Sequence, residues 1–134
     1  MYYLDSNVII DATSKRTSNQ IRPHFEKHKP EEIALPAIVL AELEYGARHS
    51  NDYENNIRIV LEFIAPFKII PFTQKEAVAY GKIREQLAKE GKIIGPNDLL
   101  VAATALANGA TIVTHNIDEF SRVNGLNIED WREA

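Results

Sequence analysis

The chain has 134 residues, of which 45% are hydrophobic and 25% are charged, with a formal net charge of −4 and no cysteine. The hydrophobic and charged fractions are those of an ordinary globular protein. The lack of cysteine excludes disulfides and thiolate metal sites. The negative net charge argues against a protein that holds nucleic acid by bulk charge alone. No apolar run is long enough for a membrane span and no secretory signal is visible, so we expect one cytoplasmic domain over residues 1–134.

Strands and helices are predicted to alternate along the chain. In chain order we predict a strand at 2–4, helices at 8–13 and 17–28, a strand at 32–35, helices at 36–48 and 52–65, a strand at 67–71, helices at 73–91 and 96–107, a strand at 111–113, a helical turn at 116–120 and a weak strand at 126–128. Thr73 and Glu76 form a capping box at the start of one helix. This order predicts an α/β domain around a parallel sheet, which binds ligands beyond the carboxyl ends of its strands.

The first candidate site residue is Asp5, which directly follows the first strand in the stretch YYLDSNVIID. An acid at this position can simply cap the helix that follows, by accepting a backbone N–H. It would also lie at the carboxyl edge of the sheet, where ligands bind. Asp5 alone leaves both interpretations open.

Glu42 is harder to explain structurally. In a helix that starts at residue 36, the other side chains on its face are Ile38, Ala41 and Tyr45. A carboxylate on such an apolar stripe must be paired, protonated or bound to a cation, unless it reaches round to solvent. Its neighbour Glu44 can instead pair with Arg48 one turn later.

Two later stretches place polar residues at similar positions. Asp98 lies in the first turn of an apolar helix, where an acid also suits the helix dipole and where Asn97 is a plausible cap. Thr114 and Asn116 leave the strand at 111–113, although Asn116 also fits a capping pattern with the acid three residues later.

If Asp5, Glu42, Asp98 and the 114–116 turn converge at one sheet edge, their carboxylates repel and one of them must take up a proton. A hard divalent cation removes that conflict, and Mg²⁺ or Mn²⁺ prefers such oxygen ligands. Zinc is disfavoured because the set contains neither histidine nor cysteine. The combination indicates phosphoryl-transfer or phosphodiester chemistry.

Few other motifs compete with this interpretation. The sequence has no Walker loop and no dinucleotide-binding, nucleophile-elbow or zincin motif. Among its histidines, His115 borders the predicted site. Lys15, Arg16 and Arg22 can form a local basic patch that attracts phosphate, or a solvated helix face.

The chain resembles the PIN-domain ribonucleases, specifically the VapC-type toxins of bacterial toxin–antitoxin pairs. The resemblance covers essentially the whole chain and rests on LDSNVII, LAELEYG, IGPNDLLVAATAL, and TIVTHNIDEF followed by NGLNIEDW. It implies a three-layer α/β/α domain with a mostly parallel central sheet of four to five strands. It also implies a Mg²⁺-dependent endoribonuclease, because the sequence is similar to VapC enzymes that cut initiator tRNA in its anticodon loop.

The family's three acids match Asp5, Glu42 and Asp98. The resemblance implies that Mg²⁺ is bound chiefly at Asp5 and Asp98, while Glu42 binds or orients a water and helps to deprotonate it. Ser6 matches a small hydroxyl residue that orients the first acid, and Asn7 matches an amide in the same turn.

Asn116 stands where many PIN domains have a fourth acid, so a second metal ion is in doubt. The resemblance implies that Thr114 and Asn116 hydrogen-bond water or phosphate. It further implies a homodimer and a cognate VapB-type antitoxin whose C-terminal segment occupies the acidic groove, often with an arginine that binds carboxylates bidentately. DNA would be contacted only through the antitoxin, and no membrane is involved.

Two alternatives remain open from the sequence. One is a non-catalytic binding module in which a metal only stabilises the fold or a complex, which the missing fourth acid favours. The other is a metal-dependent phosphomonoesterase, which would need an Arg or Lys clamp that the acidic motifs do not contain.

Overall fold

The sheet is five-stranded and entirely parallel. The computed structural model describes residues 1–14 and 18–132. The strands, in the spatial order β3-β2-β1-β4-β5, are β3 (Lys68–Ile70), β2 (Ile33–Pro36), β1 (Tyr2–Leu4), β4 (Thr111–Val113) and β5 (Asn127–Glu129). The predicted strands and the predicted parallel sheet are confirmed, with strand ends that differ by no more than about a residue from those expected.

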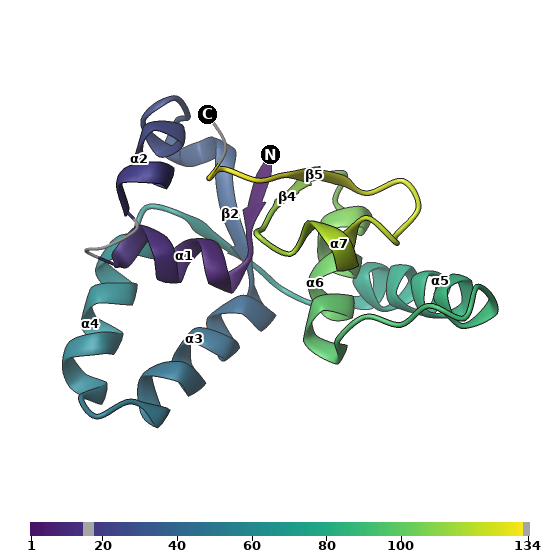
Figure 1. Ribbon diagram of the computed structural model, residues 1–134, viewed down its shortest axis with the longest axis horizontal. Coiled ribbons are helices and arrows are strands. Elements are labelled where there is room, and N and C mark those ends of the chain that lie inside the picture. Colours follow the sequence, from purple (N-terminus) through teal and green to yellow (C-terminus); the bar gives the residue numbers. More distant parts are fainter. Residues whose placement is uncertain (15–17, 133–134) are drawn as a thin grey trace.

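Helices cover both faces of this sheet. They are α1 (Ser6–Thr13), α2 (Ser18–Glu26), α3 (Ala37–His49), α4 (Tyr53–Ile64), α5 (Gln74–Lys89), α6 (Pro96–Ala107) and α7 (Ile117–Phe120), with a 3₁₀ turn at Pro30–Glu32. In Figure 1, α1 to α4 lie on one side of β1 and β2, and α5 and α6 lie on the other. The three-layer α/β/α architecture is therefore confirmed. Within the described part of the chain, no helix is both long and apolar enough to cross a membrane.

Local sequence explains most of the helix ends. The first helix starts two residues earlier than predicted, at Ser6, because Asp5 is its N-cap. Pro36 is the N-cap of α3 and the last residue of β2, rather than the first helical residue that its ring geometry suggests. The predicted helix at 17–28 is α2, although Thr17 lies outside the described residues.

The register of the central strands decides where the site lies. Leu4 of β1 pairs with Val113 of β4, and both side chains are fully buried. The next residues, Asp5 and Thr114, therefore leave the sheet side by side at its carboxyl edge. The Asp5 N–H donates to the Val113 carbonyl at 2.9 Å, which continues the ladder by one step.

The C-terminal segment packs against α2 after it leaves β5. Trp131 is 1% exposed and lies parallel to the rings of His24 and His28, with centroid distances of 5.5 and 5.2 Å. Phe25 meets the same indole edge-on at 5.1 Å. The end of the described chain is thereby fixed to α2, because aromatic pairs add stabilisation beyond the burial of their area.

A buried acid holds the start of α5. Glu76 is 1% exposed, and the predicted capping box with Thr73 is present. The Glu76 carboxylate accepts the Thr73 backbone N–H at 2.7 Å, the Thr73 hydroxyl, and the Asn108 side-chain amide at 2.9 Å. Burial opposes the charged form, but these hydrogen bonds outweigh it and lower the pKa of Glu76 from 4.5 to about 2.

We predict that Glu76→Gln lowers the free energy of unfolding at pH 7 by about 1–3 kcal/mol, because it replaces charge-assisted hydrogen bonds with weaker ones. The folded-state pKa lies below the unfolded one, so the contribution is complete above about pH 4.5 and is lost as the pH falls towards 2. Urea unfolding across this pH range measures it. Glu85→Gln is the control, because Glu85 is an exposed acid of the same helix that pairs with Lys89. Equal acid sensitivity in the wild type and in Glu76→Gln would contradict the assignment.

Candidate active site

Asp5 is both a helix cap and a buried acid at the sheet edge. Its Oδ1 accepts the Ser6 N–H at 2.9 Å, and its Oδ2 accepts the Thr114 hydroxyl at 2.8 Å. The residue is only 2% exposed, and burial raises its pKa, although both hydrogen bonds oppose the rise. The capping and site interpretations of Asp5 are thus compatible, because each uses a different oxygen.

Glu42 lies on α3, but not on the stripe that faces the core. The buried residues of α3 are Val39, Leu43 and Ala47, whereas Ala41 is exposed and Tyr45 is 69% exposed. The predicted apolar face of α3 is therefore wrong, since a neighbouring stripe with the same spacing packs against the core. Glu42 lies at the border between these faces.

The carboxyl group of Glu42 is nevertheless unusual. Its Oε1 atom is buried and, within the described chain, has no hydrogen-bond partner. Burial raises the pKa of Glu42 and the charge of Asp5 raises it further, while the side chains of Asn97 and Ser6 oppose the rise. A buried carboxylate oxygen without a partner costs free energy, so it is a candidate to receive a ligand or a proton.

Glu44, two residues further along α3, has the structural role expected of it. Its Oε1 accepts from the Arg48 guanidinium at 2.9 Å and from the Tyr53 hydroxyl at 2.6 Å. These hydrogen bonds lower the pKa of Glu44. The carboxylate of Glu44 is therefore paired with neighbouring side chains, whereas Glu42 has a carboxylate oxygen without a partner in the described chain.

Asp98 enters the site from the first turn of α6. The helix is capped by Gly95 with Pro96 in its first turn, so Asn97 is not the capping residue that the sequence suggested. The pKa of Asp98 rises to about 7, mainly through burial and then through its interactions with Glu119 and with Asp5. An acid with such a pKa is in an environment that destabilises its charged form.

Asn116 links Asp98 to a further acid, Glu119. The Asn116 side-chain amide donates to Asp98 Oδ2 at 3.1 Å and to Glu119 Oε2 at 2.7 Å, and it makes no capping hydrogen bond to α7. The Asn116 backbone N–H donates to the Thr114 hydroxyl oxygen at 3.0 Å. Sequence reasoning gave Glu119 only a capping role and so missed it. Its spacing from Asn116 was the available signal, but that spacing also fits a cap.

The remaining predicted residues frame the site. Asn7 Oδ1 accepts the His115 backbone N–H at 3.3 Å, which fastens α1 to the turn after β4. The Ser6 backbone N–H, rather than the hydroxyl that the resemblance implies, donates to Asp5, whereas the Ser6 side chain interacts with Glu42. Of the predicted basic patch, Arg22 is exposed on α2, whereas Lys15 and Arg16 lie outside the described residues.

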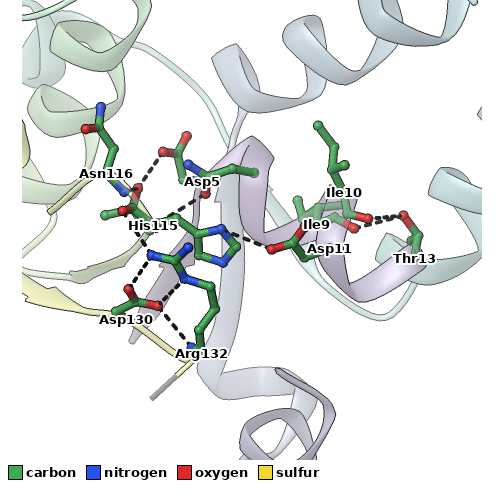
Figure 2. Close-up of polar contacts among 11 residues, drawn as sticks. Asp5, Ile9, Ile10, Asp11, Thr13, His115, Asn116, Asp130 and Arg132 are labelled. Atoms are coloured by element: carbon green, nitrogen blue, oxygen red, sulfur yellow. Dashed lines mark hydrogen bonds and ion pairs between the residues drawn. The ribbon is translucent and has the colours of Figure 1, made fainter. Parts of the chain in front are cut away.

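His115 belongs to a separate polar network beside the acids. Its Nδ1 lies 3.1 Å from Asp11 Oδ2, and Arg132, which pairs with Asp130, donates to the His115 carbonyl at 3.4 Å (Figure 2). Burial, followed by the Arg132 charge, lowers the pKa of His115. The Nδ1 atom is therefore paired with Asp11, while Nε2 is buried and has no hydrogen-bond partner among the described residues.

Comparison with known proteins agrees with this geometry. Residues 2–126 match the protein family described as the PIN domain. Ribonuclease VapC2 of Rickettsia felis is 40% identical over 98% of both chains, and the tRNA(fMet)-specific endonuclease VapC of Salmonella typhimurium is 35% identical over 97% of both. A crystal structure of DNA-bound VapBC from Salmonella typhimurium contains a chain that is 34% identical, with a TM-score of 0.90 over 97% of both chains. The chain belongs to the VapC ribonucleases of the PIN-domain family.

Asp5, Glu42 and Asp98 are the residues of this VapC chain that could hold a cation. The charge of Asp5 raises the pKa values of Glu42 and Asp98, and the charge of Glu42 raises that of Asp98, so the three carboxyl groups lie within electrostatic reach of one another at the carboxyl edge of the sheet. In residues 1–14 and 18–132, no three Asp, Glu, His or Cys side chains are gathered tightly enough to hold an ion on their own. Mg²⁺ needs only one or two carboxylates, because it keeps several waters. The all-oxygen donors and the unpartnered Glu42 Oε1 therefore fit such an ion.

We predict that Thr114→Val lowers RNA cleavage by this VapC chain roughly 10- to 100-fold, as loss of a supporting hydrogen bond does in metal sites. Valine keeps the shape of threonine but removes the hydroxyl that donates to Asp5 and accepts from Asn116. Initial cleavage rates measure the effect, with circular dichroism as a check on folding. Thr114→Ser restores the hydroxyl and should keep most of the activity. If the serine variant is as impaired as the valine one, packing rather than the hydrogen bond is responsible.

Proposed function

We propose that this VapC toxin is a Mg²⁺-dependent endoribonuclease that cuts tRNA, with the anticodon loop of initiator tRNA as its target. The observation that carries the proposal is the set of three carboxyl groups with raised pKa values at one sheet edge. Such a set is stable in its charged form only when a cation or protons neutralise it. The tRNA target rests on the Salmonella typhimurium relative, which is named for tRNA(fMet).

The residues divide the chemistry between them. Asp5 and Asp98 would hold the ion, and the Thr114 hydroxyl fixes the rotamer of Asp5. Glu42 would orient the attacking water and hold its proton on Oε1, the oxygen that has no other partner in the described chain. When bound, Mg²⁺ supplies the Lewis-acid chemistry that offsets charge on the phosphate and lowers the pKa of water. The expected products carry 5′-phosphate and 3′-hydroxyl ends.

A single ion is the stoichiometry we propose. Asn116, at the position of a fourth acid, has its amide nitrogen between Asp98 and Glu119. Its N–H groups stabilise these two carboxylates without adding charge. The amide thus performs, as a neutral group, part of the compensation that a second ion would provide.

We further propose that the chain acts in the cytoplasm as a homodimer of single PIN domains and that a cognate VapB-type antitoxin neutralises it. The VapBC complex from Salmonella typhimurium supports such a partner for a chain of this fold. An antitoxin arginine would satisfy the same carboxylates as the cation does, because guanidinium pairs bidentately with carboxylate. DNA would be bound only through the antitoxin.

We predict that Glu42→Gln lowers the rate of RNA cleavage by at least about 100-fold, because the amide can no longer take up a proton. Glu44→Gln is a matched control, since it lies on the same helix but is already paired with Arg48 and Tyr53. It should cleave at close to the wild-type rate. Comparable activity of the two variants would remove the assigned role of Glu42.

We also predict that EDTA abolishes cleavage of tRNA and that Mg²⁺ or Mn²⁺ restores it, whereas Asp5→Asn stays inactive yet folded. Sequencing the RNA ends after brief expression in cells identifies the bond that is cut. Cleavage that persists in EDTA would exclude the metal-dependent mechanism. A folded wild type that binds metal but cuts no RNA would favour a non-catalytic module. Hydrolysis of a nucleotide monophosphate in preference to tRNA would indicate a phosphomonoesterase.

A further inference from the structure

A large aromatic side chain stands in solvent close to the acids. Tyr45 is 69% exposed, and its ring lies nearly parallel to that of His49, with an interplanar angle of 18° and a centroid distance of 5.7 Å. Both residues lie on α3, one turn apart. The core of the protein does not explain this pair, because the buried residues of α3 lie on a different face.

Tyr45 is continuous with the active site through an open cavity of about 460 Å³, whose lining residues are Ser6, Ile10, Ile38, Ala41, Glu42, Tyr45, Asn97 and Leu100. Its size is within the range of about 300–1,000 Å³ that is common for ligand pockets. Tyr45 lines the cavity and His49 does not, so the tyrosine stands between the histidine and the acids. Along the helix axis, Tyr45 is about 4.5 Å from Glu42 and His49 is about 10 Å from it.

The lining of this cavity suits a flat ligand with polar edges. Ile10, Ile38 and Leu100 supply apolar surface, while Ser6 and Asn97 supply hydrogen-bonding groups. A nucleobase has both properties, and unpaired bases are commonly bound by stacking on exposed aromatic side chains. An acidic chain that acts on RNA also needs a source of affinity other than bulk charge, and stacking requires no net positive charge.

Basic charge next to this pair is already compensated. Arg48 pairs with Glu44 at 2.9 Å, and its guanidinium lies over the Tyr53 ring at 4.3 Å. Arg48 is thus engaged with Glu44 and Tyr53, whereas the Tyr45 ring is exposed, which favours a base over a phosphate as the ligand of this part of the described surface.

We propose that Tyr45, supported by His49, is a stacking platform for an unpaired base adjacent to the scissile phosphodiester. The proposal rests on the proposed ribonuclease function and adds to it a reason for preferring looped RNA. A phosphate bound at the acids would bring the neighbouring base to the cavity, where the ring of Tyr45 can cover it. Duplex RNA keeps its bases stacked on one another and cannot use this platform.

The test measures binding of RNA rather than its cleavage. It uses the full chain with Asp5→Asn, so that the RNA stays intact, and a short unpaired oligoribonucleotide that carries 2-aminopurine. Adding Tyr45→Ala should weaken binding of this RNA about tenfold or more, whereas Tyr45→Phe and Tyr45→Trp should preserve it. Fluorescence of the 2-aminopurine should be quenched only when an aromatic residue occupies position 45. Binding of a duplex of the same sequence should be unaffected by all three changes.

Leu61→Ala is the control for loss of an exposed apolar side chain, because Leu61 on α4 is 48% exposed and does not line this cavity. Binding of unpaired RNA that is insensitive to Tyr45→Ala would overturn the platform alone. Failure of the protein with Tyr45 intact to bind either RNA would overturn the platform together with the proposed function.

Two other results would also overturn the platform. A changed oligomeric state of Tyr45→Ala in sedimentation would identify a contact with a second copy. Unchanged RNA binding with weakened binding of the cognate antitoxin would identify a protein-binding face.

Discussion

The hydrogen bond from the Thr114 hydroxyl to Asp5 is the contact on which the site depends. This buried hydrogen bond joins the ends of β1 and β4. Its two residues, Asp5 and Thr114, are 109 positions apart in the sequence. Without such a donor, a carboxylate at the end of the central strand would be desolvated with one oxygen unsatisfied. The same hydroxyl accepts the Asn116 N–H, so one threonine orients the first acid and the turn that contacts the third.

The other acids of the site are placed where their negative charges repel one another. Asp5, Glu42 and Asp98 come from three different parts of the fold. The charge of Asp5 makes ionisation of the other two less favourable, and Glu42 does the same to Asp98. Asn116 relieves part of this repulsion by donating to two carboxylates at once. Glu76, elsewhere in the same fold, is as buried as Asp5 but has its pKa lowered, because Thr73 and Asn108 donate hydrogen bonds to its carboxylate. The contrast shows that burial alone does not make a reactive acid; the kind of neighbour decides.

The sequence predicted the elements well and the orientations less well. The strands were recognisable because short apolar runs end at polar or glycine-rich breaks, and Glu44 was recognisable from its spacing to Arg48. The core-facing stripe of α3 was not, since Val39, Leu43 and Ala47 have the same helical spacing as the stripe that contains Glu42. Periodicity identifies candidate faces but not which of them meets the sheet. Glu119 was missed for a related reason: its contact with Asp98 depends on how α6 and α7 pack, and no local pattern records that packing.

The segment after Gly125 has a consequence for how the limits of this domain are drawn. The PIN-domain match ends at residue 126, yet β5 lies beyond it, and the Glu129 carbonyl accepts the backbone N–H of Thr114 at 3.1 Å. Trp131 then anchors that strand against α2. A fragment that ends at residue 126 would leave β4 as an exposed edge strand and would remove the backbone contact that positions Thr114, the residue that supports Asp5. The folded unit thus extends beyond the range that matches the family, and its last few residues help to hold the strand next to Asp5.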